Sequence, residues 1–396
     1  MKETFFFCYP WDLDHEGVEA AVGRMAGDIG VNALSVAATL HSLRERRARA
    51  APGPRTIEME AAAHFQPDAP RYANTRIRPL VGAWLKARNP LEKILREAEL
   101  VGLHRRVSMV ATHSAPLAAR YPLIACVDVF GDPICSCMCP ANAEVREFVA
   151  ALVDDLSTNY PVETIELADF WFGGRHPHPH LRGGISLAEV ESGLFDWCFC
   201  ASCRQRATDA GLDVEQVADR VRDHLEAAFR LEPPRCGSLD ELLAEEPTLA
   251  EFHRLRLEAV ASLLSQVRSR AKARVLADLS GLSADEAAWR AVSLTALAAG
   301  CDGLLLAPPA AEHHEGRAFF EEAVQAVHGP PRVDLSITCY PPRTRTAPAL
   351  VSEVRRLAEV GYSGFGFHNY GLAPEPCLDW VRLAVRYARR ESGQAP

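Results

Sequence analysis

The sequence has no hydrophobic run long enough to span a membrane, and its N-terminus lacks the extended apolar segment of a secretion signal. The opening residues, MKETFFFCYPWDLDHEG, contain one lysine and a short apolar run, FFFC. We therefore expect a cytoplasmic protein that has no membrane partner.

The chain also has no excess of positive charge, because 43 Lys and Arg against 52 Asp and Glu give a formal net charge of −9. The basic patch RERRARA at residues 44–50 is too local to form a nucleic-acid footprint, so nucleic acid is not an expected partner. With 48% hydrophobic residues among 396, the chain can bury a large core.

Cysteine is too sparse for a disulfide scaffold, since there are 12 in the whole chain. In a reducing compartment, clustered cysteines indicate either a metal site or simple burial.

Short β-rich apolar runs alternate with amphipathic stretches along the whole chain. These runs predict strands at residues 4–10, 32–38, 106–113, 164–172, 274–280, 302–309, 333–342 and 364–371. Helices are predicted between them, including residues 89–103, 142–160, 285–300, 316–329 and 347–361. The alternation predicts an α/β fold, the (β/α)8 TIM barrel. A doubly wound sheet is the alternative, but no strand is followed by a Gly-rich phosphate turn.

Two connections are much longer than a barrel loop requires, residues 38–90 after the second strand and residues 171–250 after the fourth. Both contain aromatic residues at intervals and little Ser/Gly repetition, so we expect folded insertions. We predict a single domain, residues 1–396, with both insertions covering the C-terminal face of the barrel.

Polar and aromatic residues follow the predicted strands, where catalytic residues of this fold lie. This mixture suits a sugar-like ligand, because rings stack on apolar sugar faces and paired acceptors bind hydroxyls. For the group after the eighth strand, a structural role is an equal alternative. The candidates are Trp11 and Asp12 after the first strand, His113 after the third, Glu166 and Asp169 on the fourth, Asp278 on the fifth, and His368, Asn369 and Tyr370 after the eighth.

A resemblance extends over residues 60–225. It is carried by HFQPDAPRY with IRP, by VFGDPICSCMCPANAEVREFVAALVDDLSTNYPVETIELADFWF, and by DWCFCASCRQRATDAGLDVEQV after a His-rich stretch. In order and spacing these segments resemble the glycoside hydrolase-like (β/α)8 proteins, most of which have no assigned substrate. The resemblance implies a barrel with a carbohydrate-type cleft.

Retaining glycosidases of this barrel type usually carry an acid/base Glu after the fourth strand and a nucleophilic Glu after the seventh. Here the seventh strand ends in SITCYPP, without a carboxylate. Glycoside cleavage still requires an acid for the leaving oxygen and a second carboxylate as nucleophile or base.

Glu166 is the predicted acid, and Asp278 is its best remaining partner, at a separation that leaves room for a water molecule. Alternatively, Glu166 pairs with an arginine inside the barrel mouth and Asp278 caps the following helix. Asp169 alternates differently from Glu166 along the strand, so we expect it to brace the loop or to hold a histidine.

Cys198, Cys200 and Cys203 form C-x-C-x-x-C, which is compact enough to hold one tetrahedral zinc ion. The fourth ligand would come from CSCMCP, with Cys139 as the predicted ligand and Cys135 and Cys137 as alternatives. Some barrel β-galactosidases resemble this arrangement, with one upstream Cys completing a structural zinc site. A site closed by four thiolates leaves no position for substrate, so the zinc would be structural. The alternative is that these thiols only pack in the core.

The segment FGGRHPHPHLRGG, residues 172–184, places His176, His178 and His180 at alternate positions of a stiff extended stretch. We expect a substrate-binding loop, because the flanking glycines permit movement and neutral imidazoles bond to sugar hydroxyls. A catalytic metal site and a solvated loop are the alternatives.

These features predict a carbohydrate-active enzyme that acts on a small glycoside by acid/base catalysis, without an organic cofactor. Two other functions remain open: a non-catalytic carbohydrate-binding barrel, and a metal-dependent lyase or isomerase that uses the histidine loop.

Overall fold

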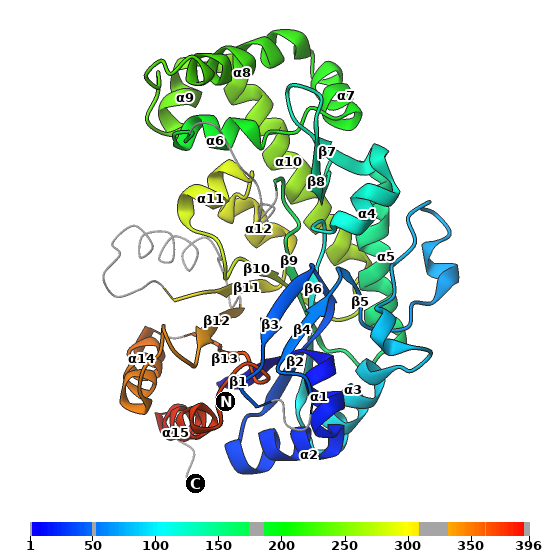
Figure 1. Ribbon diagram of the computed structural model, residues 1–396, viewed down its shortest axis with the longest axis vertical. Coiled ribbons are helices and arrows are strands. Elements are labelled where there is room, and N and C mark those ends of the chain that lie inside the picture. Colours follow the sequence, from blue (N-terminus) through cyan, green and yellow to red (C-terminus); the bar gives the residue numbers. More distant parts are fainter. Residues whose placement is uncertain (1, 50–52, 174–185, 309–331, 361, 392–396) are drawn as a thin grey trace.

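The computed structural model describes residues 2–49, 53–173, 186–308, 332–360 and 362–391. Its central sheet closes into a parallel barrel, because the first strand pairs with both the second strand and the last (Figure 1). The predicted (β/α)8 barrel is confirmed, and each predicted strand is present. In barrel order these are β1 (Glu3–Cys8), β2 (Ala33–Leu40), β6 (His104–Val110), β9 (Thr164–Ala168), β10 (Arg274–Asp278), β11 (Gly303–Leu306), β12 (Arg332–Thr338) and β13 (Gly364–His368).

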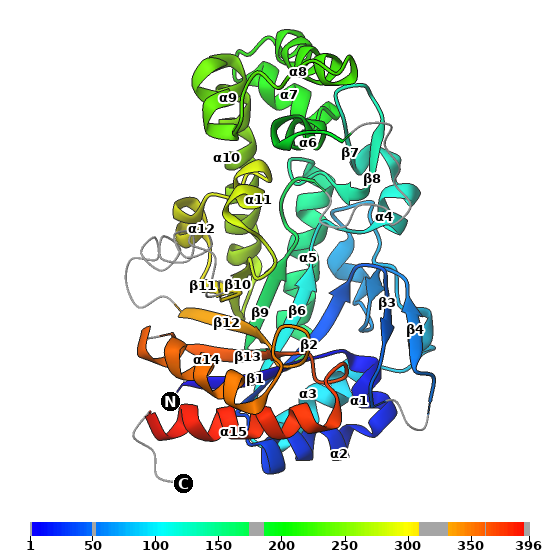
Figure 2. The ribbon, with the colours of Figure 1, turned by 60° about the vertical axis from the view of Figure 1, so that its left-hand side comes forward.

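Helices surround the barrel (Figures 1 and 2). Several begin where a side chain satisfies free backbone N–H groups. Asn142 accepts from two of them at the start of α5, and Ser283 forms a capping box at the start of α11. The helices are α1 (Pro10–Glu16), α2 (Val18–Gly23) with the π-helical turn Arg24–Ile29, α3 (Pro90–Leu100), α4 (Ala115–Arg120), α5 (Ala143–Asn159), α10 (Pro247–Arg270), α11 (Ala284–Trp289), α12 (Leu294–Gly300), α14 (Ala347–Val360) and α15 (Glu375–Glu391).

The single helix predicted at residues 285–300 is wrong, because two helices, α11 and α12, occupy this range. Ala291 lies between them at a φ of 62°, a left-handed conformation that cannot continue a helix. The helix predicted at residues 316–329 lies outside the described residues.

The first insertion connects β2 to β6. It contains an antiparallel hairpin of β3 (Leu43–Arg46) and β4 (Thr56–Met59), and the short strand β5 (Ala62–Ala63), which pairs with β2. Two 3-10 turns, Ala69–Tyr72 and Ala83–Leu85, follow before α3. In Figure 1 the hairpin lies in front of the barrel strands.

The second insertion connects β9 to β10 and forms a helical lobe at one end of the molecule (Figures 1 and 2). The N-terminal part of α10 packs on this lobe, and α10 then runs back to the start of β10. The lobe therefore lies on the side of the barrel where the strands end. Its helices are α6 (Glu189–Phe195), α7 (Ala201–Asp209), α8 (Val214–Phe229) and α9 (Leu239–Glu245).

An additional excursion follows β6. After α4 and the 3-10 turn Pro122–Ile124, β7 (Ala125–Val127) and β8 (Pro133–Met138) form an antiparallel ribbon that leads into α5. Figure 1 places this ribbon beside the helical lobe.

Side chains fill the interior of the barrel. The rings of Phe5 and Phe7 lie 5.1 Å apart between their centroids and pack with Ala33 and Leu305. A Cβ at Gly366 would come within 2.5 Å of the Phe5 ring, so only glycine fits there. A packed interior leaves the mouth as the place where a ligand can bind. In the described part of the chain, no helix is both long enough and apolar enough to cross a membrane.

Candidate functional site

Glu166 lies in the middle of β9 and points into the barrel, where its side chain is fully buried. The Ser35 hydroxyl donates to Oε2 at 2.6 Å, and Arg106 Nε donates to Oε1 at 2.6 Å. The Arg106 guanidinium in turn lies 3.7 Å from the centroid of the Phe5 ring. The structure therefore contains the arginine pair that the sequence offered as the alternative to catalysis, and this geometry suits a structural role.

Arg106 is the centre of an ion-pair network inside the barrel. Its Nη1 also lies 2.7 Å from Asp334 Oδ2 and 2.6 Å from Glu3 Oε1. Arg332 contacts the same two carboxylates, with its Nε 2.7 Å from Asp334 Oδ2 and its Nη2 2.6 Å from Glu3 Oε2. Because three carboxylates face two guanidinium groups, the fully ionised network has an excess negative charge.

The network divides this charge unevenly. Burial raises the pKa of Glu166 to about 7, with a smaller upward contribution from Asp278, although Arg106 and Ser35 oppose the shift. Burial also acts on Glu3, but Arg106 and Arg332 outweigh it and lower its pKa to about 2. Of Glu166 and Glu3, Glu166 is thus the one that takes up a proton first as the pH falls.

Asp278 is the last residue of β10 and is half-buried at the mouth. It lies on the same strand face as Leu276, the register partner of Glu166, and therefore one layer nearer the mouth. Its Oδ1 accepts from the backbone N–H of Ser280 at 2.9 Å. Ser283, not Asp278, caps α11, so the expectation that Asp278 caps the following helix is wrong.

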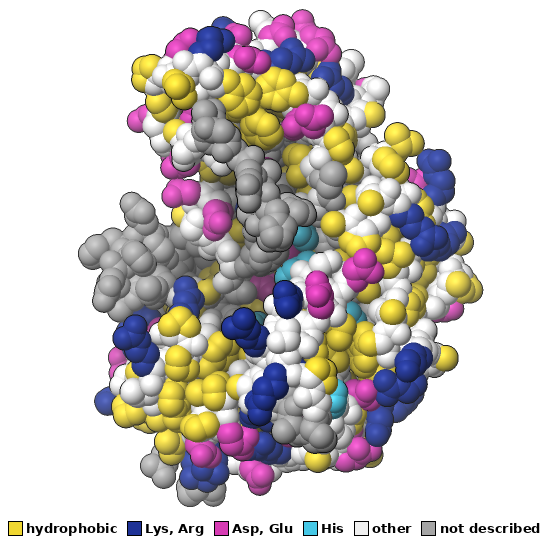
Figure 3. All heavy atoms as spheres, in the orientation of Figure 1, with side chains coloured by type: hydrophobic (Ala, Val, Ile, Leu, Met, Phe, Trp, Pro, Cys, Tyr) yellow, Lys and Arg dark blue, Asp and Glu magenta, His cyan; other side chains and the backbone are white. Residues whose placement is uncertain are grey.

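Histidines lie at the ends of three barrel strands. The His113 ring, after β6, is 6.0 Å from that of His41, which follows β2. His368 ends β13, with its ring 5.7 Å from that of Phe7. Histidine side chains are visible at the centre of the face drawn in Figure 3. His41 was not among the predicted site residues, because it follows directly on an apolar strand within a long insertion.

Asp169 follows β9 in a left-handed conformation, with a φ of 50°. Its backbone carbonyl accepts from the Thr112 hydroxyl at 2.5 Å and from the Thr112 N–H at 2.8 Å. These bonds join the loops after the third and fourth strands through the backbone of Asp169, and the bracing role of its side chain stays a prediction.

Three predicted substrate-binding residues are buried where the first and last strands join. Asn369 Oδ1 accepts from the N–H of Gly371 at 2.9 Å, and the Tyr370 hydroxyl donates to Glu16 at 2.8 Å. Asp12 forms an ion pair of 3.0 Å with Arg47. A Cβ on Gly371 would lie 1.8 Å from Asp12 Oδ2, so the carboxylate is packed against the backbone. Asp12, Asn369 and Tyr370 therefore build the joint between the strands and are left out of the proposed ligand site.

Trp11 belongs to a group of rings at the end of β1. Its ring stacks on Tyr9 with centroids 4.7 Å apart and meets His64 edge-on at 5.0 Å. Trp84 Nε1 donates to His64 Nδ1 at 3.1 Å. We call Tyr9, Trp11, His64 and Trp84 the aromatic corner. Trp11 Nε1 also donates to Oε1 of Glu45, on the hairpin, at 3.2 Å.

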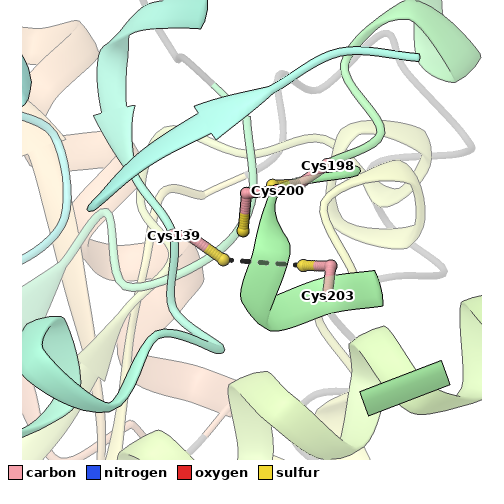
Figure 4. Close-up of side chains that lie close together, drawn as sticks. All are labelled: Cys139, Cys198, Cys200 and Cys203. Carbon is pink, nitrogen blue, oxygen red and sulfur yellow. Dashed lines mark hydrogen bonds between the residues drawn. The ribbon is translucent and has the colours of Figure 1, made fainter. Parts of the chain in front are cut away.

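The four predicted metal-binding cysteines converge (Figure 4). The sulfur atoms of Cys139, Cys198, Cys200 and Cys203 all lie within 4.8 Å of one another, and all four side chains are buried. Those of Cys139 and Cys203 are 3.6 Å apart. Tetrahedral Zn–S bonds of about 2.3 Å require sulfur separations of about 3.8 Å, so the four thiols can hold a metal ion.

The surroundings of the cysteine cluster also suit a metal–thiolate centre. The Arg256 guanidinium is buried between the rings of Phe172 and Trp197, at 4.9 Å and 4.8 Å from their centroids. Burial lowers the pKa of Arg256 to about 10, and Cys203 and Cys198 act in the opposite direction. A cation beside four thiolates offsets part of their negative charge.

The cluster joins two parts of the chain. Cys139 directly follows the β7–β8 ribbon, whereas the other three cysteines lie just before α7 or in its first turn, in the helical lobe. The cluster therefore ties the lobe to the ribbon.

The three histidines of the predicted substrate loop, His176, His178 and His180, lie outside the described residues.

No protein-family model matches the chain, and no curated protein matches it in sequence. Among solved structures, it is similar to the PgaB (BpsB) glycoside hydrolase domain from Bordetella bronchiseptica, at 12% identity and a TM-score of 0.59, over 97% of this chain and 99% of that one. The chain has the barrel fold of this domain.

Two larger enzymes share the fold. An α-L-fucosidase isoenzyme from Paenibacillus thiaminolyticus is 13% identical with a TM-score of 0.55, over 99% of this chain and 49% of that one. A β-galactosidase from a psychrophilic Marinomonas is 12% identical with a TM-score of 0.56, over 99% and 61%. The chain thus spans about half of the fucosidase and less than two thirds of the galactosidase.

The cysteine cluster predicts a metal-dependent stability. We expect purified protein to carry about one zinc ion per chain, and Cys200→Ser to lower the Tm by at least about 5 °C, because a closed thiolate site contributes folding free energy. Elemental analysis and thermal melts test this, with Cys377→Ser as the control at a buried cysteine outside the cluster. Metal-free protein whose Tm a chelator leaves unchanged would contradict the assignment.

The Arg106 network predicts a structural role for Glu166. Glu166→Ala should lower the free energy of unfolding by about 1–3 kcal/mol, because Arg106 Nε and the Ser35 hydroxyl lose their buried acceptor while Asp334 still balances the arginine charge. Glu166→Gln keeps the shape and an acceptor, so its loss should be smaller.

The pH dependence of the Tm of Glu166→Gln provides a second test of the Glu166 side chain. Burial raises the pKa of Glu166 to about 7 in the folded protein, so its stabilising contribution is full below pH 4.5 and is lost as the pH rises through 7. The Gln variant lacks this titration. Its Tm should therefore rise relative to that of the wild type as the pH increases from 5 to 8. A Tm difference that stays constant over this range would contradict the raised pKa of Glu166.

Proposed function

We propose that the protein is a carbohydrate-active enzyme that hydrolyses a small glycoside at the mouth of its barrel. The observation that carries the proposal is Asp278, a half-buried carboxylate at the end of the fifth strand of a barrel that is otherwise filled with side chains. The similar structures, a glycoside hydrolase domain, a fucosidase and a galactosidase, support this substrate class through their shared fold.

Asp278 is proposed as the carboxylate that activates the attacking water. Glu166 is proposed as a positioning residue beneath it, because their charges interact and Glu166 is fixed by Arg106 and Ser35. His113, after the third strand, and His368, at the end of the eighth, are proposed to bond to sugar hydroxyls. The half-buried ring of Tyr9, which stacks on the buried Trp11, is proposed as a platform for an apolar sugar face.

The metal at the cysteine cluster is proposed to be zinc with a structural role, because four thiolates leave no coordination position for a substrate. The cysteine side chains that the structure describes are free thiols, which supports a reducing, cytoplasmic location.

A non-catalytic carbohydrate-binding barrel is the second candidate. Two observations favour it: Glu166 is sealed inside the barrel, and the seventh strand is followed by Cys339 and Tyr340 instead of a carboxylate. A binding barrel would retain the rings and histidines at the mouth and would have no turnover.

Asp278→Asn separates the two candidates. On a panel of 4-nitrophenyl glycosides, we expect the variant to lose at least about 10²-fold in kcat, as removal of a general base does. Binding of an iminosugar and the Tm should change little, because the substitution keeps the size of a half-buried side chain. Asp209→Asn, at an exposed carboxylate of the lobe, is the control.

Full activity in Asp278→Asn would contradict the catalytic assignment. Wild-type protein that binds sugars by calorimetry but turns over no member of the panel would leave the binding barrel as the function.

A further inference from the structure

Glu45 is a carboxylate on the inward face of the β3–β4 hairpin. Along β3, Leu43 and Glu45 are half-buried, whereas Arg44 and Arg46 are exposed. Since successive strand residues point to opposite faces, the hairpin turns an acidic side chain toward the barrel and its basic ones toward solvent. An inward-facing carboxylate loses solvation free energy. A functional role for Glu45 would explain why this cost is tolerated.

The contacts of Glu45 leave part of its carboxyl group available. Among the described residues, only Trp11 donates to it, through the 3.2 Å bond from Nε1 to Oε1. Trp11 is itself fixed by its stack on Tyr9 and its edge contact with His64. The Trp11 ring thus fixes the orientation of Oε1, and Oε2 can bind a ligand.

The charged groups around Glu45 come from three segments. Burial raises its pKa to about 7, and the Asp12 carboxylate adds to the rise, while Trp11 and Arg47 oppose it. Arg47 is already paired with Asp12 at 3.0 Å, which limits how far it stabilises the ionised form of Glu45. Tyr340, after the seventh strand, and Tyr9, after the first, also interact with the Glu45 charge.

Glu45 and Asp278 belong to opposite sides of the mouth. Trp11, which holds Glu45, follows β1, and Asp278 ends β10. In the closed sheet, three strands separate β1 from β10 in either direction. Inversion uses carboxyl groups on opposite faces of the sugar, and the strand order supports such a placement for a ligand bound between them.

We propose that Glu45 is the general acid of the glycosidase, a catalytic residue held by Trp11 across the mouth from Asp278. This proposal rests on the proposed function. Glu45 donates its proton to the glycosidic oxygen as the bond to the anomeric carbon breaks, and the leaving group departs as an alcohol. A water molecule attacks the same carbon, and Asp278 takes its proton. Solvent then returns a proton to Glu45 and removes one from Asp278.

The test compares leaving groups. A 2,4-dinitrophenyl glycoside needs no protonation to depart, whereas a 4-methylphenyl glycoside of the same sugar does. Glu45→Gln should therefore lose at least about 10²-fold in kcat on the second substrate and less than about 10-fold on the first. In the wild type, kcat on the second substrate should fall as the pH rises through 7, and the variant should lack this limb. Glu58→Gln, at an exposed residue of β4 in the same hairpin, should behave as the wild type.

Equal losses on both substrates by folded Glu45→Gln would overturn the acid role and leave the proposed function intact. Wild-type protein inactive on both substrates would overturn the proposed function and the role of Glu45 with it.

Trp11→Phe provides a second measurement if Glu45→Gln does not fold. It removes the bond that favours the ionised carboxyl group, so the alkaline limb should move to higher pH. A limb that stays in place would count against Glu45.

Discussion

The buried guanidinium group of Arg106 is the interaction on which the barrel depends. It binds carboxylates from the first, fourth and seventh strands, so one side chain of the third strand ties together strands on several sides of the barrel. A cation in this position requires anionic partners, because an unpaired buried charge is strongly destabilising. Glu166 and Asp334 are both fully buried in meeting this requirement.

The Arg106 network also engages carboxylates of the fourth and seventh strands inside the barrel. Glu166 and Asp334 both bind the Arg106 guanidinium below the mouth. Under the proposed function, the carboxyl groups that act on the substrate are Asp278, at the end of the fifth strand, and Glu45, on an insertion. In this proposal the carboxylates inside the barrel stabilise the fold and those at its rim carry out the reaction.

The sequence predicted the barrel well because each strand is a compact apolar run bounded by polar or Pro/Gly residues. Glu166 was predicted as the acid, but Arg106, its partner inside the barrel, lies 60 residues away in the sequence, and the pattern along one strand does not reveal such a pairing. The predicted fourth strand was also too long, because the apolar run continues through Phe170, Trp171 and Phe172, whereas β9 ends at Ala168 and Asp169 turns into a left-handed conformation. The four cysteines were placed correctly, since C-x-C-x-x-C brings three thiols together whatever surrounds them. No motif in the sequence marked Glu45, because the pairing of β3 with β4 decides which residues of β3 face inward.

The basic patch at residues 44–50 shows how far burial can change the meaning of a charge pattern. In the sequence it reads as a local surface patch, yet Arg47 is almost fully buried and bonds both to Asp12 and to the Pro54 carbonyl at 2.7 Å. Arg49 donates to the carbonyls of Tyr370 and Ala373, at 2.6 Å and 3.0 Å. These arginines anchor the hairpin to the joint between the first and last strands. The position of Glu45 is therefore set by the barrel, and Asp12 and Tyr370 contribute to the site through the hairpin they hold.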